Sequence, residues 1–170
     1  MGQTMITGAF FVLLIFSVMN ANRMISESNQ STYEGEAANL AVDVARSIID
    51  EAQRKQFDLS VVPNTYQPAS DFTSSSSLGP AYYESISPWP DVAPFKSIST
   101  YNDIDDYNGY SRTVDLGGIS GFVATVQVYY VNPSTLSKTT ARTYLKCISV
   151  TVTHSQYLED GVTFTSMVTL

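Results

Sequence analysis

The sequence MITGAFFVLLIFSVM, at residues 5–19, is almost wholly apolar and lies in a stretch, residues 1–22, that has no charged side chain. No proline interrupts the chain between this segment and Phe57, and an amphipathic pattern follows it. A helix over residues 3–57 would be roughly 80 Å long at about 1.5 Å per residue. Its first ~22 residues would span about 33 Å, enough for the ~30 Å hydrocarbon core of a bilayer. The segment therefore predicts a helix that can be held in a membrane and that continues well beyond it.

Two simpler interpretations of the apolar segment are a removed signal peptide and a single-span anchor for a surface domain. A signal peptide has a basic region before its apolar core and a small-residue cleavage site after it. Here nothing basic precedes Met5, and residues 19–22 make a poor cleavage site. The single-span anchor stays open. Small and hydroxylated residues also interleave with the bulky ones, as is typical of helices that approach closely in an apolar setting.

The second half of the predicted helix has apolar residues at intervals of three and four, which indicates one stripe of an α-helix. These residues are Ala37, Leu40, Ala41, Val44, Ala45, Ile48, Ile49 and Ala52. We expect the helix to end near Phe57 and Asp58. Gly35 is the expected position of a kink or a melted turn, because glycine costs about 1 kcal/mol in a helix interior.

The rest of the chain changes character twice, which gives three parts: residues 1–57, 58–100 and 101–170. Six of the seven prolines lie in the middle part, which predicts a long irregular surface excursion. In the last part β-branched and aromatic residues alternate with polar ones around residues 122–131, 143–153 and 162–168. Residues 110–116 are a fourth expected strand, and we expect turns at Gly117-Gly118, 132–134 and 159–161. The prediction is an α+β fold in which a long N-terminal helix covers an antiparallel β-meander.

Composition excludes several classes of function. The net charge is −7 and the nine Lys and Arg are scattered, so we expect no nucleic-acid partner. The single cysteine, Cys147, excludes an intrachain disulfide and is expected to be a small buried residue. His154, the one histidine, is expected to be a surface or satisfied side chain at a strand end. Because no catalytic motif occurs, we expect a protein that is not an enzyme and that has no cofactor, with calcium as the one exception considered below.

That exception is a local cluster of oxygen-bearing side chains, Asp103, Asp105, Asp106 and Asn108, followed by Gly109. Calcium takes six to eight hard oxygen ligands, and the chain must turn tightly around it. No glutamate stands at the closing position of an EF-hand, so the pattern is not that motif. The alternative is a cluster of Asx turns that leads into the strand at residue 110. Both interpretations are kept.

The stretch ANLAVDVARSIIDEAQRKQFD, at residues 38–58, follows an apolar helix and precedes an antiparallel sheet, and in this arrangement the chain resembles the type IV pilin superfamily. Leu40, Ala41, Ala45, Ser47, Ile48, Ile49, Glu51, Phe57 and Asp58 match a stretch of minor pilins and pseudopilins. The segment YNDIDDYNGYSRTV, at residues 101–114, resembles pilin-like proteins of the mannose-sensitive haemagglutinin pilus type.

The resemblance implies a structural subunit that is held in the cytoplasmic (inner) membrane before pilus assembly machinery adds it to an extracellular filament. Its partners would be copies of itself. The polymerisation core would be formed by Met5, Phe10, Phe11, Leu13, Leu14 and Phe16. The alternatives are a minor pilin or pseudopilin, which primes a fibre or acts as a secretion piston, and a monomeric membrane-anchored binding domain.

One departure from the superfamily concerns the glutamate usual at the fifth mature position, which pairs with the N-terminal amine of a neighbouring subunit. If Met1 is the mature N-terminus, Met5 stands there and cannot form the ion pair, so assembly would rest on apolar packing. A second register, in which cleavage after Gly2 leaves Gln3 first, resembles archaeal-type pilins.

Overall fold

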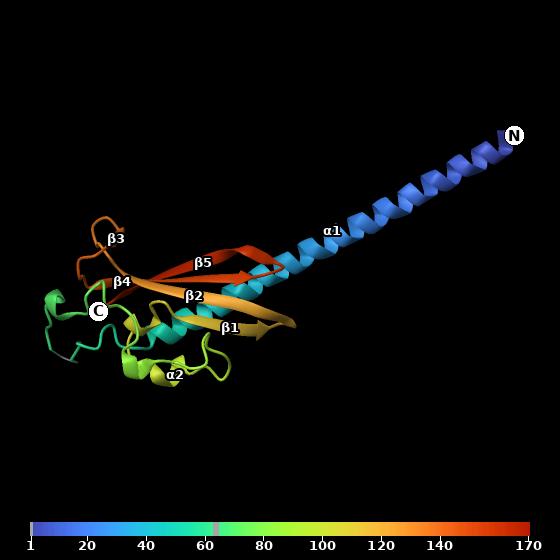
Figure 1. The fold of residues 1–170 in the computed structure, drawn as a ribbon. Helices are drawn as coiled ribbons and strands as arrows, with labels where there is room; N and C mark the ends of the chain where they lie inside the picture. The colour runs from blue at the N-terminus through green and yellow to red at the C-terminus, as the bar shows by residue number, and fades with distance from the viewer. Residues whose placement is uncertain (1, 63–64) are drawn as a thin grey trace. The chain divides into compact units, whose positions relative to one another are not determined.

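The computed structural model describes residues 2–62 and 65–170, with the side chains of residues 2, 4 and 5 outside the description. The chain forms two compact units, Met1–Glu36 and Ala37–Leu170. The described residues of the first unit are wholly α-helical and belong to α1 (Gly2–Gln53). The second unit contains the end of α1, an irregular segment and an antiparallel sheet (Figure 1). The predicted α+β fold is confirmed.

The helix α1 includes Gly35, so the melted turn expected at that glycine does not form. It ends at Gln53, four residues before the predicted Phe57. The cause is a long-range backbone pairing: the Gln56 N–H donates to the Asn102 carbonyl at 3.2 Å, and the Gln56 carbonyl accepts from Ile104 N–H at 2.9 Å. This pairing draws the chain into an extended conformation just past the helix.

Residues 54–110 are mostly irregular and carry only short helices, and the predicted excursion at residues 58–100 lies within this range. The short helices are η1 (Ala69–Asp71), η2 (Tyr82–Glu84), α2 (Ser97–Thr100) and η3 (Asp105–Tyr107). The predicted excursion is therefore held by side-chain contacts to the helix and the sheet more than by its own backbone pairing.

The sheet contains β1 (Ser111–Leu116), β2 (Ile119–Val131), β4 (Leu145–His154) and β5 (Leu158–Thr169) in the order β1-β2-β4-β5. All neighbours are antiparallel, and the short β3 (Lys138–Thr139) pairs with β2. The turn at Gly117-Gly118 is where it was predicted. Both glycines have positive φ, and a Cβ on Gly117 would lie 2.8 Å from a methyl of Leu40. The positive φ favours glycine at both positions, and the missing Cβ of Gly117 leaves room for the Leu40 side chain.

The turn predicted at residues 159–161 is wrong, because these residues belong to β5 and the chain turns earlier, at residues 155–157. Gly161 has φ +69°, and the register between β4 and β5 shifts opposite it, between Val152 and His154. The glycine therefore forms a β-bulge, which a sequence reading mistakes for a hairpin turn because both need positive φ.

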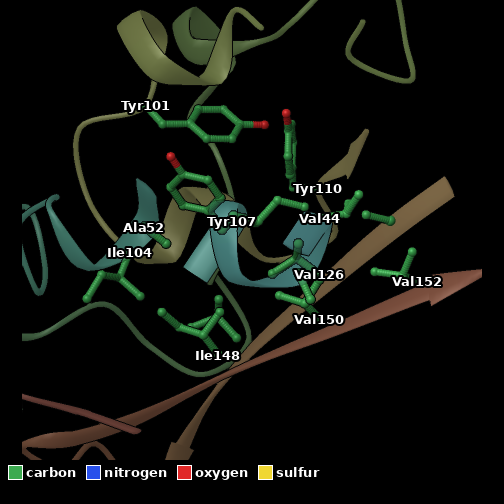
Figure 2. Close-up of a cluster of buried hydrophobic side chains, with 14 of the residues drawn as sticks. Val44, Ala52, Tyr101, Ile104, Tyr107, Tyr110, Val126, Ile148, Val150 and Val152 are labelled. Atoms are coloured by element: carbon green, nitrogen blue, oxygen red, sulfur yellow. The ribbon is translucent and has the colours of Figure 1, made fainter. Parts of the chain in front are cut away.

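The core of the second unit lies between the α1 stripe and one face of the sheet (Figure 2). On the helix, Ala37, Ala41, Ala45 and Ala52 are fully buried together with Val44 and Ile48. The alanines let the helix backbone approach the sheet closely, and the predicted stripe is confirmed. Residues from the loop before β1 complete the core: the rings of Tyr101, Tyr107 and Tyr110 contact one another edge to face, with centroids 5.0–5.6 Å apart.

Candidate functional site

The most exposed apolar surface of the first unit is the α1 segment at residues 6–25. Its bulky apolar side chains are all exposed, from 46% at Leu14 to 72% at Ile6. Residues 10–16 are seven consecutive apolar residues, nearly two turns of helix, so they face every direction around the axis. A helix that is hydrophobic all round requires lipid or other protein around it.

This segment contains the residues predicted as the polymerisation core. Phe10, Phe11, Leu13, Leu14 and Phe16 are exposed and available to a partner, while the side chain of Met5 lies outside the described residues. By length and composition, the helix over Ile6–Gln53 is able to cross a membrane. A membrane anchor or a signal sequence is supported to that extent, and polymerisation stays a prediction.

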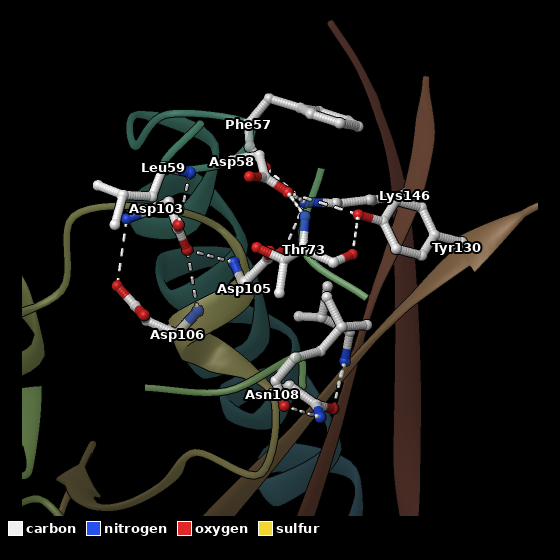
Figure 3. Close-up of polar contacts among 12 residues, drawn as sticks. Phe57, Asp58, Leu59, Thr73, Asp103, Asp105, Asp106, Asn108, Tyr130 and Lys146 are labelled. Atoms are coloured by element: carbon white, nitrogen blue, oxygen red, sulfur yellow. Dashed lines mark hydrogen bonds and ion pairs between the residues drawn. The ribbon is translucent and has the colours of Figure 1, made fainter. Parts of the chain in front are cut away.

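A second candidate site lies in the core, where the side chain of Lys146 is completely buried (Figure 3). Lys146 is on β4, on the same face as Ile148 and Val150, and points toward the helix end. Its Nζ donates to the Phe57 carbonyl at 2.7 Å, to Asp58 Oδ2 at 3.1 Å and to Asp105 Oδ1 at 2.5 Å. All three ammonium hydrogens are thus used. One lysine ties the end of α1 and the loop before β1 to the sheet.

The two carboxyl groups that contact Lys146, those of Asp58 and Asp105, differ in their surroundings. Asp58 also accepts hydrogen bonds from Ser60 and from the Thr73 N–H. Burial by itself would raise the pKa of Asp58, but these hydrogen bonds and the Lys146 charge outweigh it and lower the pKa to about 2. Burial raises the pKa of Asp105 to about 7 although Lys146 acts against it. Asp105 Oδ2 is buried and has no hydrogen-bond partner among the described residues.

The four predicted calcium ligands lie in this same region, but their side chains turn to separate partners (Figure 3). Asp103 accepts from the backbone N–H groups of Leu59, Asp105 and Asp106, and Asp106 accepts from those of Asn102 and Asp103. Asn108 joins the Leu78 carbonyl to the Val128 N–H. Among residues 2–62 and 65–170, no group of three His, Cys, Asp or Glu side chains is arranged to hold a metal. Calcium binding stays a prediction.

A third polar cluster joins α1 to β1 through Glu51 and Arg112. Arg112 Nη2 lies 2.5 Å from Glu51 Oε2, and the two side chains are 3% and 12% exposed. The other Glu51 oxygen accepts from Ser97 Oγ at 2.6 Å and from the Tyr107 hydroxyl at 2.8 Å. The guanidinium carbon of Arg112 also stands 3.9 Å from the centre of the Phe95 ring. This cluster holds the excursion against both the helix and the sheet.

The remaining two candidates have structural roles. His154 is buried at the end of β4, where Nε2 lies 3.1 Å from the Ser120 carbonyl and Nδ1 accepts the N–H groups of Gln156 and Tyr157. The satisfied histidine expected from the sequence is confirmed. Cys147 is free and buried, also as expected.

Sequence reasoning missed Lys146 and Arg112 as buried charges. A signal for Lys146 was present, since it occupies an inward position in the alternation of Ile148, Val150 and Val152. Charged residues are almost never fully buried unless they are paired, so an inward lysine predicts a buried carboxylate partner.

No family model, curated protein or solved structure matches this chain. The assignment of function therefore depends on the sequence resemblance and on the geometry of the two units.

Proposed function

We propose that this chain is a pilin-like structural subunit that polymerises through its N-terminal helix into an extracellular filament of the type IV kind. The observation that carries the proposal is the exposed segment at residues 6–25, in which residues 10–16 are apolar on every face. The segment belongs to the same helix, α1, as the buried stripe beginning at Ala37. Before assembly, the membrane would cover this segment. In the filament, the same segment of neighbouring subunits would cover it.

Energetics support such an exchange. Burying one bulky apolar side chain in place of exposing it to water is worth about 1.5–3 kcal/mol. Lipid and a bundle of apolar helices both provide that burial, so a subunit can move from one to the other without exposing the segment to water. Small residues such as Gly8 and Ala9 let helices pack closely where no water is present to drive association. A Cβ on Gly8 would meet no atom of its own chain, so that side of the helix has room for a partner.

The test is fibre formation by cells that produce the chain. Surface material is sheared off, examined by negative-stain microscopy and identified by mass spectrometry. Leu14→Asp is expected to abolish fibres, because an unpaired charge in an apolar core costs several kcal/mol. Asn29→Asp is the matched control, since it adds the same charge to α1 outside the apolar segment, and it should leave fibres intact. Normal fibres from Leu14→Asp would refute the proposal.

A second variant separates polymerisation from membrane insertion, because an aspartate disturbs both. Gly8→Leu makes the segment more apolar and should leave the chain in the membrane fraction, while its bulk prevents close approach of a second helix. We expect membrane-bound subunit and few fibres. If the wild-type chain stays in the membrane and forms no fibres, the anchored binding domain is the better assignment.

A further inference from the structure

The closest contact between an amine and a carboxyl group in the core is the one between Lys146 and Asp105. Nζ lies 2.5 Å from Asp105 Oδ1, and the two side chains are 0% and 3% exposed. Because Oδ1 is bonded to the carboxyl carbon, Nζ can be no farther from that carbon than one carbon–oxygen bond length beyond this distance. Reacting atoms in near-attack geometries are about 3–3.5 Å apart. The upper bound is about 3.7 Å, so a small approach of the amine brings it to attack distance from the carboxyl carbon.

We propose that Lys146 and Asp105 join in an intramolecular isopeptide bond, an amide between Nζ and the Asp105 side-chain carbonyl. The bond would link β4 to η3 within the second unit. This inference does not depend on the filament proposal, because it concerns only residues of the folded domain.

The reaction is a condensation that needs no oxidant, reductant or other co-reactant. A proton first moves from the Lys146 ammonium to the Asp105 carboxylate, which gives a neutral amine and a neutral acid. The amine lone pair then attacks the carboxyl carbon, and the Nζ–Cγ bond forms. Nζ gives up a second proton, the Cγ–OH bond breaks, and the hydroxyl leaves with that proton as water. The third hydrogen stays on the amide nitrogen.

The surroundings act differently on the two groups. The rings of Phe57 and Tyr130, 4.4 and 5.1 Å from Nζ, stabilise the ammonium form of Lys146, whereas the surroundings of Asp105 favour its neutral acid. Asp105 Oδ2 is buried without a hydrogen-bond partner in the described part of the chain, which is costly for a carboxylate oxygen and far less so for a carboxylic acid. Because both side chains are buried, bulk water has little access to the amide, which disfavours the reverse hydrolysis.

Hydrogen bonding distinguishes Asp105 from Asp58, the other carboxyl group that contacts Lys146. Asp58 accepts four hydrogen bonds besides that of Lys146: two from Ser60, one from Thr73 N–H and a long one from the Tyr130 hydroxyl. These donors stabilise the carboxylate form, which is a poor electrophile. Asp58 therefore stays ionised, and its oxygen 3.1 Å from Nζ is placed to accept the second proton from the amine. Asp105 is the group attacked.

Such a bond would do for this domain what a disulfide does elsewhere. The chain has one cysteine and thus no intrachain disulfide. The link would join residues 41 positions apart in the sequence and fix the loop before β1 to the start of β4. Cross-links restrict the unfolded chain and thereby stabilise the folded one.

The test is the intact mass of the full chain, purified from membranes in mild detergent and shown to be folded by protease resistance before it is unfolded for mass spectrometry. Lys146→Arg cannot form the bond, and comparison with this variant cancels any processing at the chain ends. The wild-type chain is expected to be lighter than its sequence predicts by one water molecule. Lys138→Arg, at an exposed lysine, is the matched control and should keep that deficit.

Two further measurements identify the bond. A protease digest of the wild-type chain should contain one branched peptide that joins the segments holding residues 105 and 146. Asp105→Asn should form the same amide with loss of ammonia in place of water, which shows which side chain is attacked. Asp58→Asn should react more slowly and leave a mixture of linked and unlinked chains. A folded wild-type chain with the full sequence mass, and with no branched peptide in its digest, overturns the proposal.

Discussion

Replacing Glu51 by glutamine is expected to destabilise the domain at residues 37–170 by about 3–5 kcal/mol, the usual cost of breaking a buried ion pair from one side. The pair is close, with 2.5 Å between Arg112 Nη2 and Glu51 Oε2, and the two side chains are 3% and 12% exposed. The amide conserves the size of the side chain, so the loss comes from charge and hydrogen bonding and not from a cavity. It is a large fraction of the 5–15 kcal/mol that stabilises a typical domain.

The contacts of Glu51 show why the cost should be high. Both carboxylate oxygens accept hydrogen bonds, Oε1 from Ser97 and Tyr107 and Oε2 from Arg112. Glutamine has one acceptor oxygen, so its amide hydrogens would face at least one of these donors. Arg112 would keep the Tyr110 hydroxyl and the Ser97 hydroxyl as acceptors, and neither of them is charged.

One nearby charge limits the loss. Asp91 accepts a hydrogen bond from the Tyr110 hydroxyl at 2.7 Å, and that hydroxyl in turn accepts from Arg112 Nε at 2.9 Å. Through the Tyr110 hydroxyl, Asp91 thus partly compensates the positive charge of the guanidinium. We therefore expect a value nearer 3 than 5 kcal/mol, within the usual range for such pairs.

The assay is urea unfolding followed by fluorescence of the single tryptophan, Trp89, whose ring contacts that of Tyr110 with centroids 5.9 Å apart. The matched control is Asp50→Asn, which removes a carboxylate at the neighbouring, exposed position of the same helix. It should change the free energy of unfolding by less than about 0.5 kcal/mol. If Glu51→Gln unfolds at the same urea concentration as the control, the ion pair does not hold the helix to the sheet and the reasoning is wrong.

Four further predictions concern the same domain. Ile48→Ala should cost about 2–5 kcal/mol of unfolding free energy, measured in urea, because it empties a filled position under the sheet. A chain beginning near Ser28 should fold, whereas one beginning at Leu59 lacks the α1 stripe and should be aggregated or molten. If the shorter chain unfolds cooperatively with equal stability, α1 does not stabilise the sheet as described. Asp58, whose pKa is lowered from 3.8 to about 2, should stabilise the fold at neutral pH by roughly 2–3 kcal/mol, and this contribution should fade as pH falls from about 4 to 2. Asp58→Asn should lack that decline in a pH series of unfolding free energies. If residues 103–108 bind calcium, Tm should be higher in millimolar calcium than in chelator. At a calcium concentration 100 times Kd, binding adds about 2.7 kcal/mol to the free energy of unfolding. An unchanged Tm would mean that these residues form an ordinary turn and bind no calcium.

The sequence predicts well those elements whose side chains repeat with a period. The stripe of α1 and the alternation in β2, β4 and β5 are visible because each residue's exposure follows from its position in a regular element. The end of α1 is different, because Gln53 is followed by residues that the helix pattern would allow to continue. A backbone pairing with Asn102, far along the chain, ends the helix, and no local pattern reports a distant partner.

The buried charges show the same limit more sharply. Lys146 stands on an inward position of β4, so its burial could have been inferred from the alternation alone. Its partners could not, because Asp58 follows the helix and Asp105 lies in a short 3₁₀ turn, and neither belongs to a repeating pattern. The acidic cluster at residues 103–108 was visible in the sequence, but the cation that faces it comes from a strand some forty residues later.

Lys146 and calcium are two alternative partners for the acidic cluster, and the geometry weighs them differently. Calcium needs six to eight oxygens that converge on one point. Asp103 uses both of its oxygens on backbone N–H groups, and Asn108 uses its oxygen on the N–H of β2. Turning these side chains toward an ion would leave buried N–H groups unpaired, at about 1–3 kcal/mol each. Lys146 needs no such rearrangement, since its Nζ already meets Asp105. A calcium-dependent rise in Tm would therefore also require movement of the 103–108 loop. Because the Val128 N–H donates to Asn108, that movement would make the Val128 amide hydrogen exchange faster in calcium than in chelator.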